Sequence, residues 1–233
     1  MKAFLLAAGL GSRLRPLTDE KPKCLLPIGA TTLLDRWLDA FDLAGVSEVL
    51  VNTHHLADQV ERHLEARNRP PAVRTVYEPE LLGSAGTLVA NRDWVEGEPF
   101  FLACNADNLT DFDLGTLVDA HLRAGEMATL TLFRASDPTA CGIVQLDERG
   151  RMIEFVEKPA FPKGDLANAG MYVFTPAVID LCPERLPRDI GFDLLPLLVG
   201  KAHSVVIDSF LRDIGTMDGY REAAEDWALR SAL

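Results

Sequence analysis

The sequence predicts an α/β fold, built as a three-layer αβα sandwich around a mostly parallel sheet. Apolar runs of strand length alternate with segments whose apolar residues follow helical spacing, as far as residue 125. This alternation is typical of parallel strands joined by crossover helices, which cover both faces of the sheet. After residue 125 the sequence favours strands, and we expect these to extend the same sheet.

Each predicted element follows from its local pattern. Strands are predicted at residues 2–8, 48–53, 72–78 and 99–107, and helices at residues 32–45, 56–67, 84–95 and 114–125. Gly45 and Gly125 provide the stop signals of the first and last of these helices. Further strands are predicted at residues 127–135, 142–158 and 168–179, the middle range being a hairpin with its turn at residues 148–150. A final helix is predicted at residues 220–233.

The composition argues against two broad classes of partner. A net charge of −12 disfavours general affinity for nucleic acid or anionic membranes. No apolar run approaches the ~18 residues of a membrane-spanning helix, and we interpret the N-terminal apolar run as a strand and not as a secretion signal. The four cysteines are far apart and form no CxxC pair, which favours reduced thiols in a cytoplasmic protein.

A glycine-rich loop follows the first predicted strand and carries several cations. Gly9 and Gly11 allow backbone N–H groups to approach a phosphate closely, and Arg13 and Lys23 add full positive charge. The loop lacks the GxxxxGK[ST] pattern, and Leu14 stands where a dinucleotide fingerprint needs a small residue. Taken alone, the glycines are equally compatible with a surface turn that carries scattered cations.

The longer string LAAGLGSRLRPLTDEKPKCLLPIG resembles the signature of sugar-1-phosphate nucleotidyltransferases, also called nucleotide-sugar pyrophosphorylases. The resemblance implies a Rossmann-like, GT-A-like nucleotidyltransferase fold. It implies that the chain joins a nucleoside triphosphate to a sugar-1-phosphate or cyclitol-1-phosphate and releases pyrophosphate. It also implies catalytic roles for Arg13, Lys23 and Asp107, and nucleotide contacts from Leu6, Ala8, Gly9, Gly11, Ser12, Arg13, Lys23, Glu78, Gly83 and Ser84.

The family further implies a magnesium site and a sugar-phosphate site. Asp107, which follows a buried strand, and Asp213, in the segment RDIG, are the implied Mg²⁺ ligands. The sugar phosphate is implied to contact Asn105, Gly142, Glu157, Lys158 and Asn168. A second DIG, at residues 189–191, precedes an apolar run that resembles a structural segment of the family, so we interpret it as non-catalytic.

The sequence favours GTP as the nucleotide. Glu78 occupies the position implied to read the base, and an ionised carboxylate only accepts hydrogen bonds. Guanine offers two adjacent donors, whereas uracil and thymine present one N–H between two carbonyls. The segment LLGSAGTL also resembles that of mannose-1-phosphate guanylyltransferases, and the pattern as a whole is closest to mannose- and heptose-1-phosphate guanylyltransferases. UTP, dTTP and ATP stay open as donors, and backbone groups around Gly83 are an alternative means of reading the base.

We expect one domain over residues 1–233, with a nucleotide-binding half at about 1–125 and a sugar-phosphate-binding half at about 126–233. The sequence suggests the short form of the family, without a β-helix extension, and relatives often form homo-oligomers. Two rival interpretations are a nucleotide-sugar sensor without turnover and, more distantly, a dehydrogenase. Because Arg13, Lys23, Asp107 and Asp213 are all present, we favour the enzyme.

Overall fold

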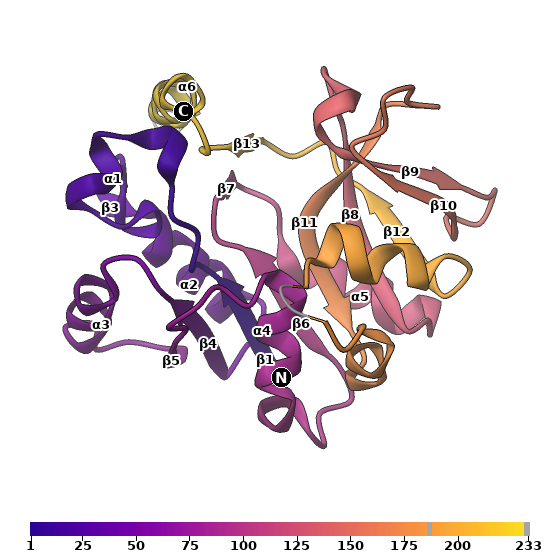
Figure 1. Ribbon diagram of the computed structural model, residues 1–233, viewed down its shortest axis with the longest axis horizontal. Helices are drawn as coiled ribbons and strands as arrows, with labels where there is room; N and C mark the ends of the chain where they lie inside the picture. The colour runs from indigo at the N-terminus through magenta and orange to yellow at the C-terminus, as the bar shows by residue number, and fades with distance from the viewer. Residues whose placement is uncertain (186–187, 231–233) are drawn as a thin grey trace. The chain divides into compact units, whose positions relative to one another are not determined.

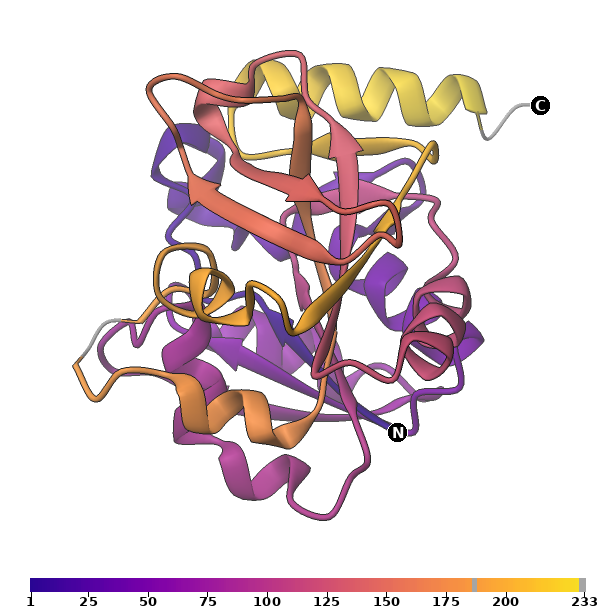
Figure 2. The same ribbon diagram turned by 90° about the vertical axis from the view of Figure 1, so that its right-hand side faces the viewer.

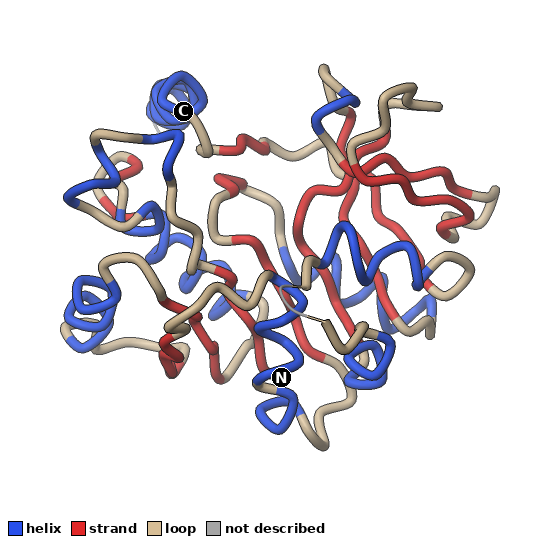
Figure 3. Tube along the Cα trace, viewed as in Figure 1, coloured by secondary structure: helices blue, strands red, loops and turns tan. Residues whose placement is uncertain are grey.

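The computed structural model describes residues 1–185 and 188–230, which form two compact units. Unit 1 comprises Met1–Lys2, Leu82–Cys104 and Asp113–Asp208, and unit 2 comprises Ala3–Leu81, Asn105–Phe112 and Ser209–Leu233. Figures 1 and 3 show their helices and strands. These units do not follow the predicted division near residue 125, since each is assembled from separate parts of the chain.

The sheet of unit 2 has the parallel character that the sequence predicts. It contains β1 (Lys2–Leu6), β4 (Glu48–Thr53) and β5 (Ala72–Tyr77) as successive neighbours. β4 and β5 run parallel, from the pair Glu48–Ala72 to the pair Thr53–Tyr77. The interior of β4 is fully buried at residues 49–51, as expected for a parallel strand that is covered on both faces.

Two helices of unit 2 follow the strands as predicted. α2 (Leu33–Leu43) begins after Thr32, whose side chain accepts a hydrogen bond from the Asp35 N–H and so caps the first turn. α3 (Ala57–Glu65) packs on β5. The buried positions of α2 recur at helical spacing, which explains why the pattern in the sequence is clear.

Short elements complete unit 2, and most of them lack a periodic pattern in the sequence. They are η1 (Ser12–Leu14), α1 (Leu17–Glu20), η2 (Lys23–Leu25), β2 (Pro27–Ile28), β3 (Thr31–Thr32), β7 (Asn108–Thr110) and β13 (Leu211–Asp213). β7 and β13 pair antiparallel, so that Asn108 lies opposite Asp213. The final helix, α6 (Met217–Arg230), begins three residues before the predicted one, and residues 231–233 of that prediction lie outside the described part.

Unit 1 contains a largely antiparallel set of strands. β11 (Leu166–Phe174) pairs antiparallel with β6 (Phe101–Asn105), β8 (Ala128–Arg134) and β9 (Gly142–Leu146). β9 and β10 (Met152–Glu157) form the predicted hairpin, which is visible in Figure 2. β12 (Ala202–Val206), which the sequence analysis did not predict, pairs parallel with β8. The strands beyond residue 125 therefore introduce antiparallel pairs into an otherwise parallel plan.

Unit 1 departs from the prediction at two places. The strand predicted at residues 168–179 ends at Phe174, and the chain continues as the helical turn η5 (Pro176–Leu181), because Pro176 has no N–H for strand pairing and suits the first turn of a helix. The predicted helix at 84–95 is broken at Asn91 into α4 (Ser84–Ala90) and η3 (Arg92–Val95). α5 (Leu114–Ala124) is capped by Asp113 and ends at Gly125 in the left-handed region, as predicted, and it packs on β8, β11 and β12. Shorter helical turns are η4 (Pro138–Ala140), η5 (Pro176–Leu181), η6 (Ile190–Leu194) and η7 (Leu195–Leu198).

The four cysteines are free thiols, as expected. Burial raises the pKa of the Cys24 thiol to about 12, so this thiol is an inert part of the core. Among the helices that the structure describes, none combines the length and apolar character needed to cross a bilayer.

Candidate functional site

The glycine loop leaves β1 at its carboxyl end and is shaped by Gly11. Gly11 has φ +61°, and a Cβ at this position would lie 2.8 Å from Thr18 Cγ2. Its carbonyl accepts hydrogen bonds from the Leu14 N–H and the Thr18 hydroxyl, both at 2.8 Å. Only glycine fits this conformation and this space without strain. Gly11 therefore fixes the shape of the loop itself.

Gly9 has a different reason for being a glycine. A Cβ at residue 9 would meet nothing within 4 Å, and the backbone there does not adopt a positive φ. The residue is exposed. The chain itself therefore does not require a glycine at position 9, and the open space beside the backbone is suited to the close approach of a ligand.

Lys23 lies between two carboxylates of unit 2. Its Nζ is 3.0 Å from Asp107 Oδ2 and 3.8 Å from Asp213 Oδ1. The Lys23 side chain is only 11% exposed, whereas those of Asp107 and Asp213 are 43% and 60% exposed. The structure thus brings together three residues that are separated by up to 190 positions in the sequence, with the carboxylates open to solvent and the ammonium set below them.

Local backbone bonds fix the position of both carboxylates. The Ala106 N–H donates to the Leu6 carbonyl at 3.1 Å, which places Asp107 beside the end of β1. The Ile214 N–H donates to the Asp107 carbonyl at 3.0 Å, next to the β7–β13 pair. The segment that carries Asp213 is therefore held directly against the segment that carries Asp107.

Arg13 lies near Asp213, and both side chains are next to Gly215. A Cβ at Gly215 would lie 2.9 Å from Arg13 Nη2 and 2.8 Å from Asp213 Oδ1. The Gly215 N–H donates to Asp213 Oδ1 at 2.6 Å. The absence of a side chain at residue 215 lets the guanidinium of Arg13 and the carboxylate of Asp213 approach this turn together.

Asn52 is a further residue of this site that the sequence analysis missed. Its Oδ1 accepts a hydrogen bond from the Ala7 N–H at 2.7 Å, and its Nδ2 donates to Glu78 Oε1 at 2.9 Å. Asn52 and Glu78 are 4% and 3% exposed. A buried chain of hydrogen bonds therefore joins the start of the glycine loop to Glu78. The signal for Asn52 is a polar residue near the carboxyl end of an otherwise apolar strand.

In unit 1, Glu157 at the end of β10 lies close to two glycines and a second carboxylate. A Cβ at Gly142 would be 2.5 Å from Glu157 Oε2, and one at Gly191 would be 2.6 Å from the same atom. Burial raises the pKa of Glu157, the charge of Asp189 raises it further, and the charge of Lys158 opposes this rise. Lys158 itself has a positive φ of 48°, and its Nζ lies 5.8 Å from the centre of the Phe192 ring.

Asp189 belongs to the second DIG of the sequence and lies at the start of η6. Its Oδ1 accepts hydrogen bonds from the Gly191 and Phe192 N–H groups and so caps η6. Ser84 donates its hydroxyl to Asp189 Oδ2 at 3.0 Å and accepts the Ile190 N–H at 2.8 Å. The predicted nucleotide contact Ser84 is thus bonded to the cap of η6.

Gly83 is required by the backbone that passes beside it. It has φ +79°, and a Cβ there would lie 2.1 Å from the Arg188 carbonyl oxygen. That same oxygen accepts the N–H groups of Ala85 and Gly86. The contacts around Gly83 therefore join the start of α4 to the backbone at Arg188.

Asn168 lies on β11 and is held by its own strand. Its Nδ2 donates to the Tyr172 hydroxyl at 2.7 Å, and its Oδ1 accepts the Gly170 N–H at 3.1 Å. Burial raises the pKa of the Tyr172 phenol. These bonds fix the orientation of the Asn168 amide.

The predicted residues thus fall into two groups. Unit 2 contains Leu6, Ala8, Gly9, Gly11, Ser12, Arg13, Lys23, Glu78, Asn105, Asp107 and Asp213, and unit 1 contains Gly83, Ser84, Gly142, Glu157, Lys158 and Asn168. Leu6 ends β1 and Asn105 ends β6. Most of the predicted triphosphate and metal residues lie in unit 2, and most of the predicted sugar residues lie in unit 1.

Comparisons with a family model and with curated proteins assign the chain to the same family. The family model described as "Nucleotidyl transferase" matches residues 2–229. The chain is 31% identical over 221 residues to the mannose-1-phosphate guanylyltransferase catalytic subunit beta of Dictyostelium discoideum, covering 92% of this chain and 61% of that protein. It is 33% identical over 245 residues to the UTP–glucose-1-phosphate uridylyltransferase of Synechocystis sp., covering 96% of this chain and 62% of that protein. The chain thus spans about three fifths of the length of these curated relatives.

Solved structures confirm the predicted fold class. A Bacillus anthracis protein assigned as a glucose-1-phosphate thymidylyltransferase matches with a TM-score of 0.83 and 24% identity, over 97% of this chain and 95% of that one. HddC from Yersinia pseudotuberculosis matches with a TM-score of 0.81 and 23% identity, over 97% and 99% of the two chains. The fold is accordingly a mixed, mostly parallel central sheet with helices on both sides.

Proposed function

Because the chain belongs to the nucleotidyl transferase family, we propose that it joins a nucleoside triphosphate to a sugar-1-phosphate or a sugar-like cyclitol-1-phosphate. The products are a nucleoside-diphosphate sugar and pyrophosphate. The observation that carries this proposal is Lys23, seated between Asp107 and Asp213 in the unit that also contains the glycine loop. Such a cluster supplies both signs of charge that a triphosphate and its counter-ion need.

The chain's own residues act by positioning and by charge. The glycine loop supplies backbone N–H groups, with open space at Gly9 for a phosphate. Arg13 holds the departing pyrophosphate, and Lys23 contacts the α-phosphate, where it stabilises the charge that develops on the equatorial oxygens. No protein nucleophile is needed, because an oxygen of the sugar-1-phosphate attacks the α-phosphorus directly as the bond to pyrophosphate breaks.

Asp107 and Asp213 fit a magnesium ion by the chemistry of their donors. Both present carboxylate oxygens to one shared cation, Lys23, and both are partly open to solvent. Mg²⁺ in phosphate-transfer sites typically uses one or two carboxylates together with substrate phosphates. When bound, the ion would neutralise phosphate charge and lower the repulsion between two anionic substrates.

The acceptor is held by the group of residues in unit 1. Glu157 accepts hydrogen bonds from sugar hydroxyls, and the glycines at 142 and 191 make room for its carboxylate. Lys158 contacts the acceptor phosphate, while Asn168 donates or accepts at another hydroxyl. Burial and the charge of Asp189 raise the pKa of Glu157 because both disfavour its ionised form. Hydrogen bonds from sugar hydroxyls would stabilise that ionised form.

GTP is the proposed nucleotide. The relatives carry the names of both guanylyl- and uridylyltransferases at similar identity, so the choice depends on Glu78. Glu78 is buried and accepts a hydrogen bond from Asn52 Nδ2 at Oε1, and a carboxylate accepts hydrogen bonds of the kind that guanine donates. UTP, dTTP and ATP are the alternatives that a direct assay separates.

The test is a matrix of nucleoside triphosphates against sugar- and cyclitol-1-phosphates, with Mg²⁺ and a coupled pyrophosphate readout. The proposal expects pyrophosphate release above background only when both substrates are present, with the highest rate for GTP. Saturable nucleotide-sugar binding without release from any pair would favour a sensor on the same fold.

A further inference from the structure

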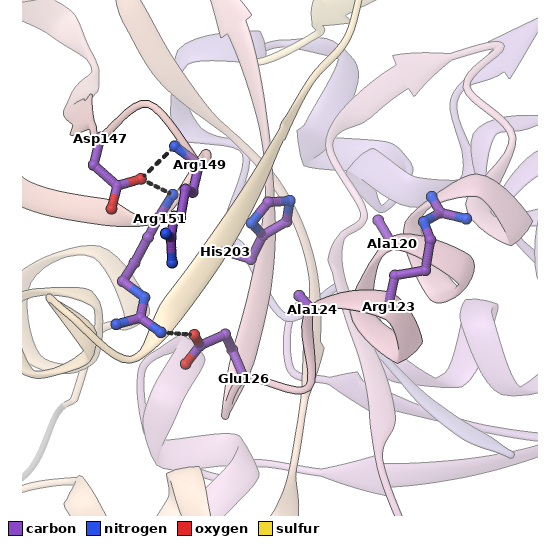
Figure 4. A pocket seen from close by; sticks show the side chains of 8 residues that line it. All are labelled: Ala120, Arg123, Ala124, Glu126, Asp147, Arg149, Arg151 and His203. Carbon is purple, nitrogen blue, oxygen red and sulfur yellow. Dashed lines mark hydrogen bonds and ion pairs between the residues drawn. The ribbon is translucent and has the colours of Figure 1, made fainter.

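A polar pocket lies wholly within unit 1 and contains no residue of the proposed active site. It has a volume of about 530 Å³ and is lined by Ala120, Arg123, Ala124, Glu126, Asp147, Arg149, Arg151 and His203. Figure 4 shows the side chains of the β9–β10 hairpin and of β12 on one side, and those of α5 on the other. The small residues Ala120 and Ala124, four positions apart on one face of α5, leave the space open.

The pocket concentrates positive charge in a protein whose net charge is −12. Its lining has three arginines against two carboxylates, and His203 adds a ring that can donate a hydrogen bond. Local cation clusters of this kind raise the concentration of small anions. The pocket thus has more arginines than carboxylates, whereas in the whole chain acidic residues outnumber basic ones by 35 to 23.

Both carboxylates are already engaged by groups of the protein. Asp147 Oδ1 accepts the N–H groups of Arg149 and Arg151, each at 2.9 Å. The hydrogen bond from the Arg151 N–H has the larger effect, and together the two bonds hold the pKa of Asp147 below its ordinary value. Glu126 Oε1 accepts a hydrogen bond from the Arg151 guanidinium, as Figure 4 shows. The charge of Asp147 also acts on Arg149, but no hydrogen bond or ion pair joins the Arg149 side chain to either carboxylate, so its guanidinium donors stay open to a ligand.

The guanidinium of Arg149 and the ring of His203 are the groups left for a ligand. Within residues 1–185 and 188–230, the structure shows no side-chain hydrogen bond or ion pair for either residue. His203 is fixed in place, because a Cβ at Gly150 would lie 2.9 Å from its Cε1 and because residue 203 pairs with residue 151 through the backbone. Arg151, oriented by Glu126, lies beside them.

We propose that this pocket binds the phosphate group of a small phosphorylated molecule, through Arg149, Arg151 and His203. Arginine donors match the geometry of phosphate oxygens, and a partly hydrated phosphate fits the polar lining. The ligand lies on the hairpin side, since the carbonyl groups at the C-terminal end of α5 disfavour an anion there. This inference is independent of the proposed catalysis, because none of its residues takes part in that site.

Amide chemical shifts of the full chain, followed during titration with inorganic pyrophosphate and separately with glucose 6-phosphate, test the proposal. We expect saturable shifts at residues 149–151 and 203, in addition to any at the glycine loop. Arg149→Ala should weaken binding at the hairpin about tenfold or more and leave the loop shifts unchanged. The matched control is Arg221→Ala, an exposed arginine of α6 that should preserve both sets.

Absence of saturable shifts at residues 149–151 and 203 in the wild-type protein with both probes, or equal shifts in the Arg149→Ala variant, would overturn the proposal. A hairpin response to only one of the two probes would support the site and identify the form of phosphate that it accepts. A response at the hairpin without one at the loop would support this pocket while contradicting the proposed catalytic function.

Discussion

The two clusters of charged residues, one in each unit, differ in how the charges of their carboxylates are compensated. In unit 2, Asp107 and Asp213 share the ammonium of Lys23, so a cation already stands against both. In unit 1, Glu157 is buried close to a second carboxylate, Asp189, and its pKa is raised because burial and Asp189 outweigh Lys158. The first cluster has its charges paired, and the second has a carboxylate that lacks full compensation.

The two arrangements suit the two proposed anionic substrates in different ways. A paired arrangement of cation and carboxylates is suited to phosphates and their metal ion, because both signs of charge are present before binding. A partly desolvated carboxylate gains most from neutral hydroxyl donors, such as those of a sugar.

Removing the shared cation should have the largest effect. Lys23→Ala leaves Asp107 and Asp213 without their ammonium, and we expect kcat to fall by roughly 10²–10³-fold, as when a group that stabilises transition-state charge is removed. Asp107→Asn should produce a loss of similar size. Pyrophosphate release measures both, and circular dichroism checks the fold. Rates near wild type in both variants would contradict the assignment of this cluster.

The two loop glycines should separate binding from folding. Gly9→Ala adds a methyl group to open space, so we expect unchanged thermal stability but a KM for the nucleotide raised by about tenfold. Gly11→Ala forces a positive φ and a contact with Thr18, so we expect a stability loss of about 1–2 kcal/mol. Calorimetry and steady-state kinetics compare the pair. A destabilised Gly9→Ala variant would show that residue 9 has a purely structural role.

Glu78→Gln tests how the base is read. Glutamine keeps an acceptor for Asn52 Nδ2 but loses the charge, so we expect the fold to persist and the preference for GTP over UTP to fall by about fivefold to tenfold. Competition between the two nucleotides gives the ratio directly, with Glu80→Gln as the exposed control. An unchanged ratio would assign the reading of the base to backbone groups.

Glu157→Gln should give a small effect on stability that depends on pH. The folded-state pKa of Glu157 lies above its unfolded value, so the wild-type protein loses stability as pH rises from that value through the folded pKa. Glutamine removes this cost. The variant should match the wild type near pH 4 and melt higher at pH 7, by at most about 4 °C. A difference in melting temperature that is constant with pH would contradict the charged state assigned to Glu157.

Much of the fold could be predicted from the sequence because its strands and helices are long and periodic. Strands β1, β4 and β5 and helices α2, α3 and α5 lie within the predicted ranges, and the β9–β10 turn is correct. The short strands β7 and β13 could not be predicted, since three residues carry no period and the pairing joins positions about 100 residues apart. The break at Asn91 was also missed, because the apolar pattern continues across it.

The candidate site shows the same limit. Individual motifs predicted Lys23, Asp107 and Asp213, and their proximity follows only from the β7–β13 pair and the bond between Ile214 and Asp107. Asn52 was missed because its importance lies in two hydrogen bonds to distant residues and not in any motif.

We propose that the cluster of unit 2 serves the nucleotide and the cluster of unit 1 serves the acceptor. Steady-state kinetics with both substrates varied, compared between Gly9→Ala and Glu157→Gln, test it most directly. We expect Gly9→Ala to raise only the KM for the nucleoside triphosphate and Glu157→Gln to raise only the KM for the sugar-1-phosphate. A rise in the KM of the same substrate in both variants would contradict it.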